Sequence, residues 1–374
     1  MGVPRRGKRP RRPTWVGHNG DVRSAGMRWG VALVFALAVA AGVASASGAS
    51  EVATFVVSGI ALAGLAWIIA VATESVGDRF GPAVTGVLQS TLGNLPELFV
   101  VLFALRAGEL IVAETSILGS IFANALLVLG LVLLAGCRAS PDGVIRFHKR
   151  LPQDTTTLLI LAVFMIVLLG LSVGSADPAS THREGISAVG AVLMITVYGI
   201  WLFRYVREEG PRADEESPAG EPPLAFSVAI ALLAVGGVAA ALVSDWFVGA
   251  LRPAIDTLNL SPQFAGIVIV AIAGNAVENA AGIVLASKGK SDLAVSVVKN
   301  SVSQIAVFLY PSLVLLSLLF ATHLTFVIQP VYVGALALTA LALWQITGDG
   351  EAYPFEGWAL VALYLILAVF AYYE

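Results

Sequence analysis

The feature that most constrains the fold is a succession of apolar segments, each about as long as a membrane-spanning helix. A helix rises 1.5 Å per residue, so about 20 apolar residues cross the hydrocarbon core of a bilayer. Eleven such segments follow one another in the 374-residue chain. The sequence therefore predicts an all-α integral membrane protein with about eleven transmembrane helices. They lie at 29–47, 52–73, 83–106, 112–136, 156–175, 186–205, 224–243, 262–286, 293–319, 324–346 and 355–373.

The composition agrees with this class and excludes others. Charged residues make up 13% of the chain, whereas a typical soluble domain carries about 25%. The single cysteine, Cys137, excludes an internal disulfide, and no spacing of cysteine and histidine indicates a zinc site. Only the N-terminus is strongly basic, so we expect a lipid bilayer and no nucleic acid as partner.

The N-terminal residues 1–28 carry eight arginines and lysines. By the positive-inside rule we interpret them as a basic cytoplasmic tail, followed by a first transmembrane helix at 29–47 and, after eleven spans, an external C-terminus. A cleaved secretory signal is the alternative, because Ala44, Ser45 and Ala46 form a possible cleavage site. We favour the uncleaved span, and we expect a bacterial cytoplasmic membrane.

Two of the predicted spans carry the same polar motif. GNLPE occupies Gly93 to Glu97 and GNAVE occupies Gly274 to Glu278, and the two glutamates are 181 residues apart (278 minus 97). A carboxylate near the middle of a bilayer costs roughly 2.5–3.5 kcal/mol on insertion scales. A costly motif that occurs twice indicates a functional site rather than helix packing.

The motifs fall in the third and eighth spans, which cross the membrane in opposite directions because they are five spans apart. A motif repeated on antiparallel spans is typical of inverted-repeat transporters, whose site lies near the midplane. We therefore expect two inverted five-helix repeats and one additional N-terminal helix. The expected divisions are the tail at 1–28, the first helix at 29–47, an N-terminal repeat at 52–205, an acidic Pro-rich cytoplasmic linker at 206–223 and a C-terminal repeat at 224–374.

Both motifs offer oxygen ligands to a cation. Asn94 and Glu97 are three residues apart, as are Asn275 and Glu278, so each pair shares one face of a helix. Carboxylate and amide oxygens, without sulfur or imidazole, fit Ca²⁺ better than zinc or copper. We predict that these four side chains bind the ion.

The first motif also predicts a break in its helix. Pro96 has no N–H to donate to the carbonyl of Leu92, and Gly93 eases a change of direction. Other polar or small residues near the motifs are candidates for an ion or proton path, although such types also serve as hydrogen-bond partners between helices. These candidates are Gln89, Ser90, Leu92, Gly93, Gly274, Ser120, Asn124, Ser301, Ser303 and Gln304.

The two acids can bind protons as well as a cation. Burial and a second carboxylate nearby favour the protonated form of an empty site, and a divalent cation reverses this preference. Cation and protons then compete for the same oxygens, and rocking of the two halves about the site turns this competition into antiport. Electrostatics alone leave open a sodium gradient as the driving force.

Each motif is followed by a glycine and then by a Ser-rich helix, GSIFAN at 119–124 and NSVSQ at 300–304. In this the chain resembles the two α-repeats of the cation/calcium exchangers, most nearly the calcium/proton antiporters, over most of residues 52–374. The resemblance implies the eleven-helix exchanger fold, with Glu97 and Glu278 as the exchanging acids. It also implies Ca²⁺ and H⁺ as transported ions and no cofactor.

Four positions depart from the family pattern. Asn279 stands where the family usually has histidine, Pro96 is more typical of sodium-coupled relatives, and Lys299 and Asn300 replace an apolar residue and a glycine. We expect Lys299 to snorkel to the cytoplasmic interface. The alternatives to Ca²⁺/H⁺ exchange are Na⁺-coupled Ca²⁺ exchange, antiport of another divalent cation, a channel and, from the enzymes, an intramembrane acid-dyad hydrolase. We expect no enzymatic activity.

Overall fold

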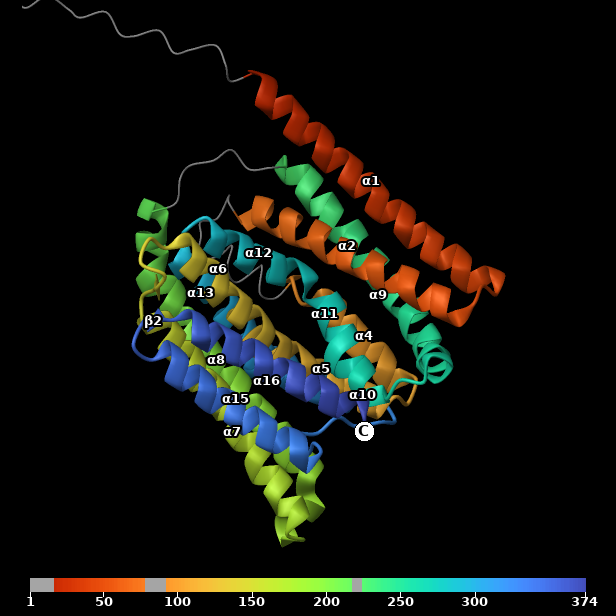
Figure 1. Ribbon diagram of the computed structural model, residues 1–374. Coiled ribbons are helices and arrows are strands. Elements are labelled where there is room, and N and C mark those ends of the chain that lie inside the picture. Colours follow the sequence, from red (N-terminus) through yellow and green to blue (C-terminus); the bar gives the residue numbers. More distant parts are fainter. Residues whose placement is uncertain (1–16, 78–91, 217–223) are drawn as a thin grey trace, which may run out of the picture.

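The computed structural model describes residues 17–77, 92–216 and 224–374 of the chain. In these ranges the protein is a bundle of helices with a single pair of two-residue strands (Figure 1). The strands, β1 (Ile145–Arg146) and β2 (Glu351–Ala352), pair antiparallel. The helices are α1 Gly17–Ser47, α2 Glu51–Gly77, α4 Leu95–Arg106, α5 Leu110–Phe122, η1 Ala123–Val128, α6 Leu129–Ala139, α7 Arg150–Gly174, η2 Pro178–His182, α8 Arg183–Glu216, α9 Phe226–Leu258, α10 Pro262–Phe264, η3 Ala265–Val270, α11 Ala271–Gly274, α12 Ala276–Ser287, α13 Ser291–Gln304, η4 Ile305–Leu309, α14 Tyr310–Ser317, α15 Pro330–Thr347 and α16 Pro354–Tyr372.

The described helices confirm an all-α, multi-pass membrane protein. Nine helical stretches in the described ranges are long and apolar enough to span a bilayer, or ten if the bent pair Pro262–Gly274 and Asn279–Ser287 counts as one span. The sequence predicts about eleven. Its third span, at 83–106, begins outside the described residues, and α4 forms its second half.

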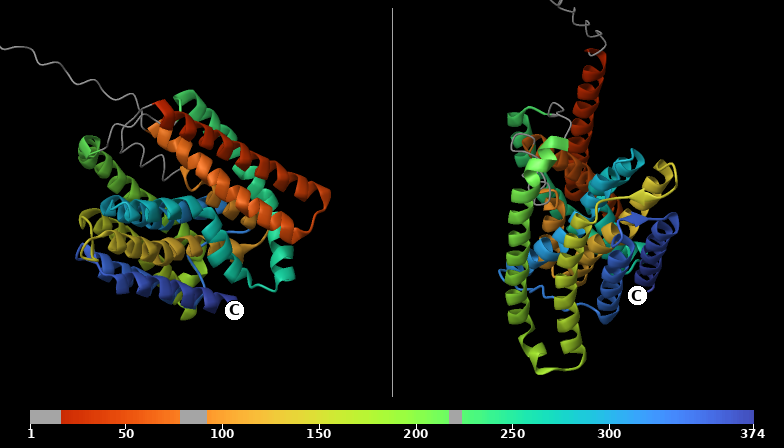
Figure 2. Two further views of the ribbon diagram at one scale, coloured as in Figure 1. Left: turned by 45° about the horizontal axis from the view of Figure 1, so that its top comes forward. Right: turned by 90° about the vertical axis from the view of Figure 1, so that its left-hand side faces the viewer.

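The first helix is longer than the predicted span. It begins at Gly17, so residues 17–28 of the expected tail are helical, while residues 1–16 lie outside the described part of the chain. α1 lies along α2 and α9 on one side of the bundle (Figures 1 and 2). Gly30 and Gly42 of α1 face the indole rings of Trp67 and Trp246, so the helix packs closely on its neighbours.

Helix α8 also outruns its predicted span, because it continues to Glu216. The first part of the expected linker at 206–223 is therefore helical, and 217–223 lie outside the described residues. Glutamate, arginine and alanine are good helix formers, and they are frequent in this segment. Hydropathy finds where the apolar segment ends, and a charged helix can extend beyond that point.

The two halves of the chain repeat the same elements at the spacing of the motifs. α4 and α12 begin 181 residues apart, at Leu95 and Ala276, and so do α5 and α13, at Leu110 and Ser291. The π-helical turns η1 and η4 follow α5 and α13 in turn. π-Helical turns are rare and frequently occur at functional sites, so their presence at matching positions links the repeat to function.

Contacts between loops show which of them lie at the same end of the bundle. At one end β1 pairs with β2, and the His148 backbone N–H donates to Asp292 Oδ1 at 2.6 Å. We call this the β end. At the opposite end His323 Nδ1 lies 3.1 Å from the Glu184 carboxylate. The predicted alternation likewise groups residues 145, 292 and 351 together, and residues 184 and 323 together.

Candidate functional site

Each motif begins a half-helix with nearly the same backbone geometry. Asn94 precedes α4 with φ −86° and ψ 11°, and Asn275 precedes α12 with φ −96° and ψ 9°. Their carbonyls accept hydrogen bonds from the N–H groups of Leu98 and Asn279, both at 3.0 Å. Helix N-termini carry a partial positive charge that favours an anionic side chain. The glutamates stand at the third position of α4 and of α12, next to these N-termini.

The sequence explains why the helices start at these positions. Pro96 lies in the first turn of α4, where a missing N–H costs nothing because that turn has no intrahelical acceptor. The predicted break is thus present, and Pro96 begins the half-helix rather than bending a continuous one. The second motif has no proline. There Gly274 ends α11, and the segments before and after the motif are bent by 59°.

The carboxylate of the first motif lies against the glycine of the second. Glu97 is only 6% exposed. A Cβ built on Gly274 would lie 3.0 Å from Glu97 Cγ and 3.1 Å from Oε1. Glycine at 274 therefore permits a contact between the two repeats that a larger residue would obstruct. The side chain of Glu278 lies outside the described part of the structure.

A buried amide network joins the second motif to the first repeat. Asn275 Nδ2 donates to Ser120 Oγ at 2.8 Å and to the Ala271 carbonyl at 2.9 Å. Asn124 Nδ2 donates to Asn275 Oδ1 and to the Ser120 carbonyl, both at 2.9 Å. In the described part of the chain Asn124 Oδ1 accepts no hydrogen bond. Ser120 and Asn124, both predicted as supporting residues, thus fix the orientation of the Asn275 amide.

A small cavity lies beside this network. Its volume is about 10 Å³, enough for roughly one water-sized species. Its polar lining consists of Glu97, Ser116 and Ser120, and the remainder is apolar. Ser116 was not among the predicted residues, although its place one turn before Ser120 on an apolar helix could have indicated it. The cavity has the size and the oxygen donors for a single bound ion.

The other predicted residues differ in how far they reach the site. Asn94 is buried at the start of α4, with Leu92 and Gly93 just before it. Ser301, Ser303 and Gln304 are buried on α13, outside the described lining of the cavity. Ser303 Oγ donates to the Asn300 carbonyl of its own helix at 2.9 Å. Gln89 and Ser90 lie outside the described residues.

Lys299 does not snorkel to an interface, so that prediction is wrong. Its side chain is 2% exposed, and Nζ donates to Thr156 Oγ1 at 2.5 Å and to Thr347 Oγ1 at 2.7 Å. Both threonine hydroxyls donate to carbonyls of their own helices, those of Pro152 and Leu343, at 2.7 Å. Their lone pairs are therefore available to the ammonium group. α7 and α15 cover α13 here, so the Lys299 ammonium group binds threonine hydroxyl groups of these helices and does not reach water.

The sodium/calcium exchanger protein family matches the chain in two stretches, residues 50–206 and 228–373, which together cover most of its length. The chain belongs to this family. Among its relatives, the Ca(2+)/H(+) antiporter ChaA of Bacillus subtilis (strain 168) is 31% identical over 320 residues, which are 84% of this chain and 90% of that protein. A Ca(2+)/H(+) antiporter of Synechocystis is 31% identical over 343 residues, 86% of this chain and 91% of that protein.

Solved structures of the family confirm the predicted exchanger fold. Native YfkE superposes with a TM-score of 0.76 at 27% identity and covers 91% of this chain and 100% of its own. The H⁺/Ca²⁺ exchanger CAX gives the same TM-score at 17% identity, covering 92% and 89%. The sodium-calcium exchanger NCX_Mj is less similar, with a TM-score of 0.53 at 18% identity, covering 83% and 95%. At these lower identities the similarity concerns the fold alone.

Proposed function

We propose that this chain is a secondary antiporter that exchanges Ca²⁺ for H⁺ across a membrane by alternating access. The contact of Glu97 with Gly274 carries the proposal, because it places an acid of one repeat at the helix break of the other, beside a cavity of single-ion size. Relatives that match most of the chain are named as Ca²⁺/H⁺ antiporters. A site between two inverted repeats is the arrangement that alternating access uses.

Charge balance explains why exchange is obligatory at such a site. In this proposal Glu97 and Glu278 supply the carboxylates, and Asn94, Asn275 and backbone carbonyls supply neutral oxygens. One Ca²⁺ neutralises two carboxylates, and so do two protons. The empty site would leave two charges in surroundings of low dielectric constant, which is costly. The protein therefore changes between its two states with either Ca²⁺ or protons bound, and rarely with an empty site.

In the amide network, a serine of one repeat orients the asparagine of the other repeat. Ser120 accepts a hydrogen bond from Asn275, and Ser301 stands 181 residues after Ser120, the spacing of the motifs. We extend the proposal by symmetry, so that Ser301 holds Asn94 as Ser120 holds Asn275. Ser120 and Ser301 then orient the amide oxygens of Asn275 and Asn94 toward the ion. Each serine moves with the repeat to which it belongs.

We further propose that the β end faces the cytoplasm of a bacterial cell, with the N-terminus inside and the C-terminus outside. Cationic side chains are concentrated at this end, as the positive-inside rule requires. The proposed repeats are residues 52–205 and 224–374, with 206–223 between them. The cationic residues of the β end include Arg138, Arg146, Lys149, Arg150, Lys288 and Lys290.

The proposal is tested by Ca²⁺ flux in proteoliposomes under an imposed pH gradient or an imposed Na⁺ gradient. We expect Ca²⁺ movement to follow the pH gradient. Glu97→Gln and Glu278→Gln should each reduce it by a factor of about 100 or more, since removing one charged partner of a buried site costs roughly 3 kcal/mol or more. Glu51→Gln, at the exposed start of α2, is the matched control. Flux that follows Na⁺ and ignores pH would overturn the coupling, and retained exchange in Glu97→Gln would overturn the site.

A further inference from the structure

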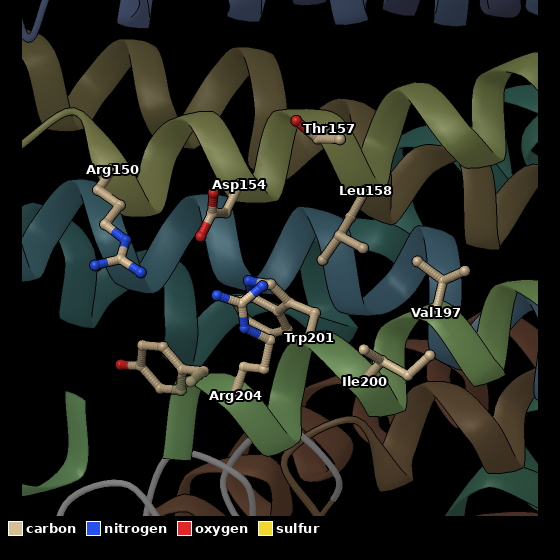
Figure 3. A pocket seen from close by; sticks show the side chains of 9 residues that line it. Arg150, Asp154, Thr157, Leu158, Val197, Ile200, Trp201 and Arg204 are labelled. Carbon is tan, nitrogen blue, oxygen red and sulfur yellow. The ribbon is translucent and has the colours of Figure 1, made fainter. Parts of the chain in front are cut away.

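An amphipathic cavity lies between α7 and α8, apart from the ion site. Its volume is about 340 Å³. Figure 3 shows its lining side chains, which reach from both helices into the space between them. Arg150, the first residue of α7, places the cavity at the β end of the bundle. None of the described residues around the Glu97 cavity takes part in this lining.

One half of the cavity is charged. Arg150 and Arg204 reach into it from α7 and α8, and Asp154 lies on α7 one turn after Arg150 (Figure 3). Both arginines are exposed. The lining of this half thus contains two cations and one carboxylate. Guanidinium groups present paired N–H donors that match phosphate oxygens, and they keep their charge at any physiological pH.

The other half of the cavity is apolar and opens toward the region that lipid chains occupy. Leu158 forms its buried part, while Val197 is 42% and Ile200 58% exposed. Trp201 lies between Ile200 and Arg204 along α8, and its ring stacks with that of Tyr205, the residue after Arg204, with centroids 5.4 Å apart. Tryptophan and tyrosine concentrate where a membrane protein meets the headgroup layer. Along α8 the lining therefore passes from apolar side chains through Trp201 to the charged end, as a lipid leaflet passes from acyl chains through the interface to the headgroups.

We propose that this cavity binds the headgroup of an anionic glycerophospholipid. The phosphate lies between the guanidinium groups of Arg150 and Arg204, and a headgroup hydroxyl donates to the Asp154 carboxylate. One acyl chain runs over the exposed side chains of Val197 and Ile200. Basic pockets between transmembrane helices are established binding places for anionic headgroups, and charge complementarity selects them.

The size of the cavity agrees with a headgroup rather than a whole lipid. Since about 10–15 Å³ of such a cavity holds one water-sized group, 340 Å³ holds on the order of 25 of them, which is enough for a headgroup and too few for a diacyl lipid. The acyl chains must then leave the cavity over its apolar side. A free phosphate ion would use the arginines alone and would leave the apolar half without a role.

Aromatic contacts connect this cavity to the elements around the ion site. Trp201 lies 5.7 Å from the ring of Tyr198, and Tyr198 lies 5.5 Å from that of Phe308 in η4. Leu309, the next residue of η4, lines the Glu97 cavity. A lipid that holds Trp201 in place therefore braces α8 against η4, so we expect the lipid to stabilise the folded chain.

The test measures lipid binding to the purified full chain in detergent, by native mass spectrometry and by thermal unfolding. Phosphatidylglycerol and phosphatidylcholine with identical acyl chains are the probes. We expect phosphatidylglycerol alone to remain bound and to raise the Tm. Arg150→Gln and Arg204→Gln should each weaken its binding about fivefold, and the double variant about 25-fold. Arg138→Gln, an equal change of charge at the exposed end of α6, should leave binding unchanged.

Three outcomes would overturn the proposal. They are equal binding of the two lipids, an equally large effect of Arg138→Gln, and full displacement of phosphatidylglycerol by inorganic phosphate at equal concentration. If the glutamine variants do not fold, Thr157→Trp keeps both arginines and fills the cavity from an exposed lining position. Binding that survives this change would also contradict the site. No readout depends on ion exchange, so the result is independent of the proposed function.

Discussion

At the scale of single residues, the contact between Glu97 and Gly274 makes the most direct prediction. In Gly274→Ala the new Cβ would lie 3.0–3.2 Å from three atoms of the glutamate, so the carboxylate must rotate away. An off-rotamer side chain costs about 0.5–1.5 kcal/mol, or roughly two- to tenfold in affinity. We expect the KM for Ca²⁺ in proteoliposomes to rise by this factor. Gly334→Ala on α15, which meets nothing within 4 Å, should not change it, and an unchanged KM in Gly274→Ala would argue against this position for Glu97.

A second residue-scale prediction concerns the buried ammonium group of Lys299. Thr347→Val removes one of its two hydroxyl acceptors and should lower the free energy of unfolding by about 1–3 kcal/mol, because a buried charged donor loses its partner. Lys299→Met should leave stability equal or higher. It removes the desolvation cost, and both threonines keep their own carbonyl acceptors. Denaturation of the two variants in one detergent compares them directly. If Lys299→Met is the less stable of the two, the ammonium group is a net stabiliser and this reasoning fails.

The sequence indicates a candidate site residue where that residue repeats or stands out from an apolar background. Asn275, Ser120 and Asn124 were predicted in this way and the structure joins them by hydrogen bonds, while their part in ion binding stays a prediction. Ser116 was missed, although its place one turn before Ser120 on an apolar helix was a usable signal. The partners of Lys299 could not be predicted. They come from α7 and α15, which only the packing brings to α13.

At the scale of elements, glycine controls how closely the repeats approach. A Cβ at Gly119 of α5 would lie 2.5 Å from Ile267 Cα and 2.6 Å from its carbonyl oxygen in η3. Backbone atoms cannot rotate away from the new Cβ as side-chain atoms can, so Gly119→Ala must push α5 and η3 apart. We expect a loss of about 1–3 kcal/mol in unfolding free energy, the usual cost of overpacking. Gly249→Ala on α9, with open space around it, is the control, and equal stability of the two variants would contradict the close crossing.

Hydropathy predicted the apolar body of each element well and its ends poorly. The break at the first motif was predicted from Pro96 and Gly93, whereas the break at Asn275 was not predicted, because the second motif has no proline. The start of α1 at Gly17 and the end of α8 at Glu216 were not predicted either. Both lie in charged sequence, where the apolar signal stops although the backbone hydrogen bonds continue. The π-helical turns η1 and η4 were also missed, because their residues are as apolar as the helices around them.

At the scale of the whole molecule, the pairing of loops fixes which parts of the chain share a side of the membrane. The β end and the opposite end follow from contacts such as His148 with Asp292 and His323 with Glu184. α12 leads from the second motif toward the loop of Asp292 at the β end, whereas the span of the first motif begins outside the described residues. The opposite direction of the two spans, which loop charge and inverted repeats imply, stays a prediction. No pattern in the sequence could predict which loops touch.

Thiol labelling in sealed cells tests this arrangement together with the proposed orientation. Lys290→Cys places a thiol at the β end and Ala179→Cys places one at the opposite end, both at exposed positions. A membrane-impermeant maleimide added outside should label Ala179→Cys alone, and Lys290→Cys should react only after the cells are opened. Cys137 is 3% exposed, so the parent chain should remain unlabelled and serves as the control. Reversed labelling would overturn the orientation alone, whereas labelling of both variants from outside would place both ends on one side and contradict the alternation of the spans.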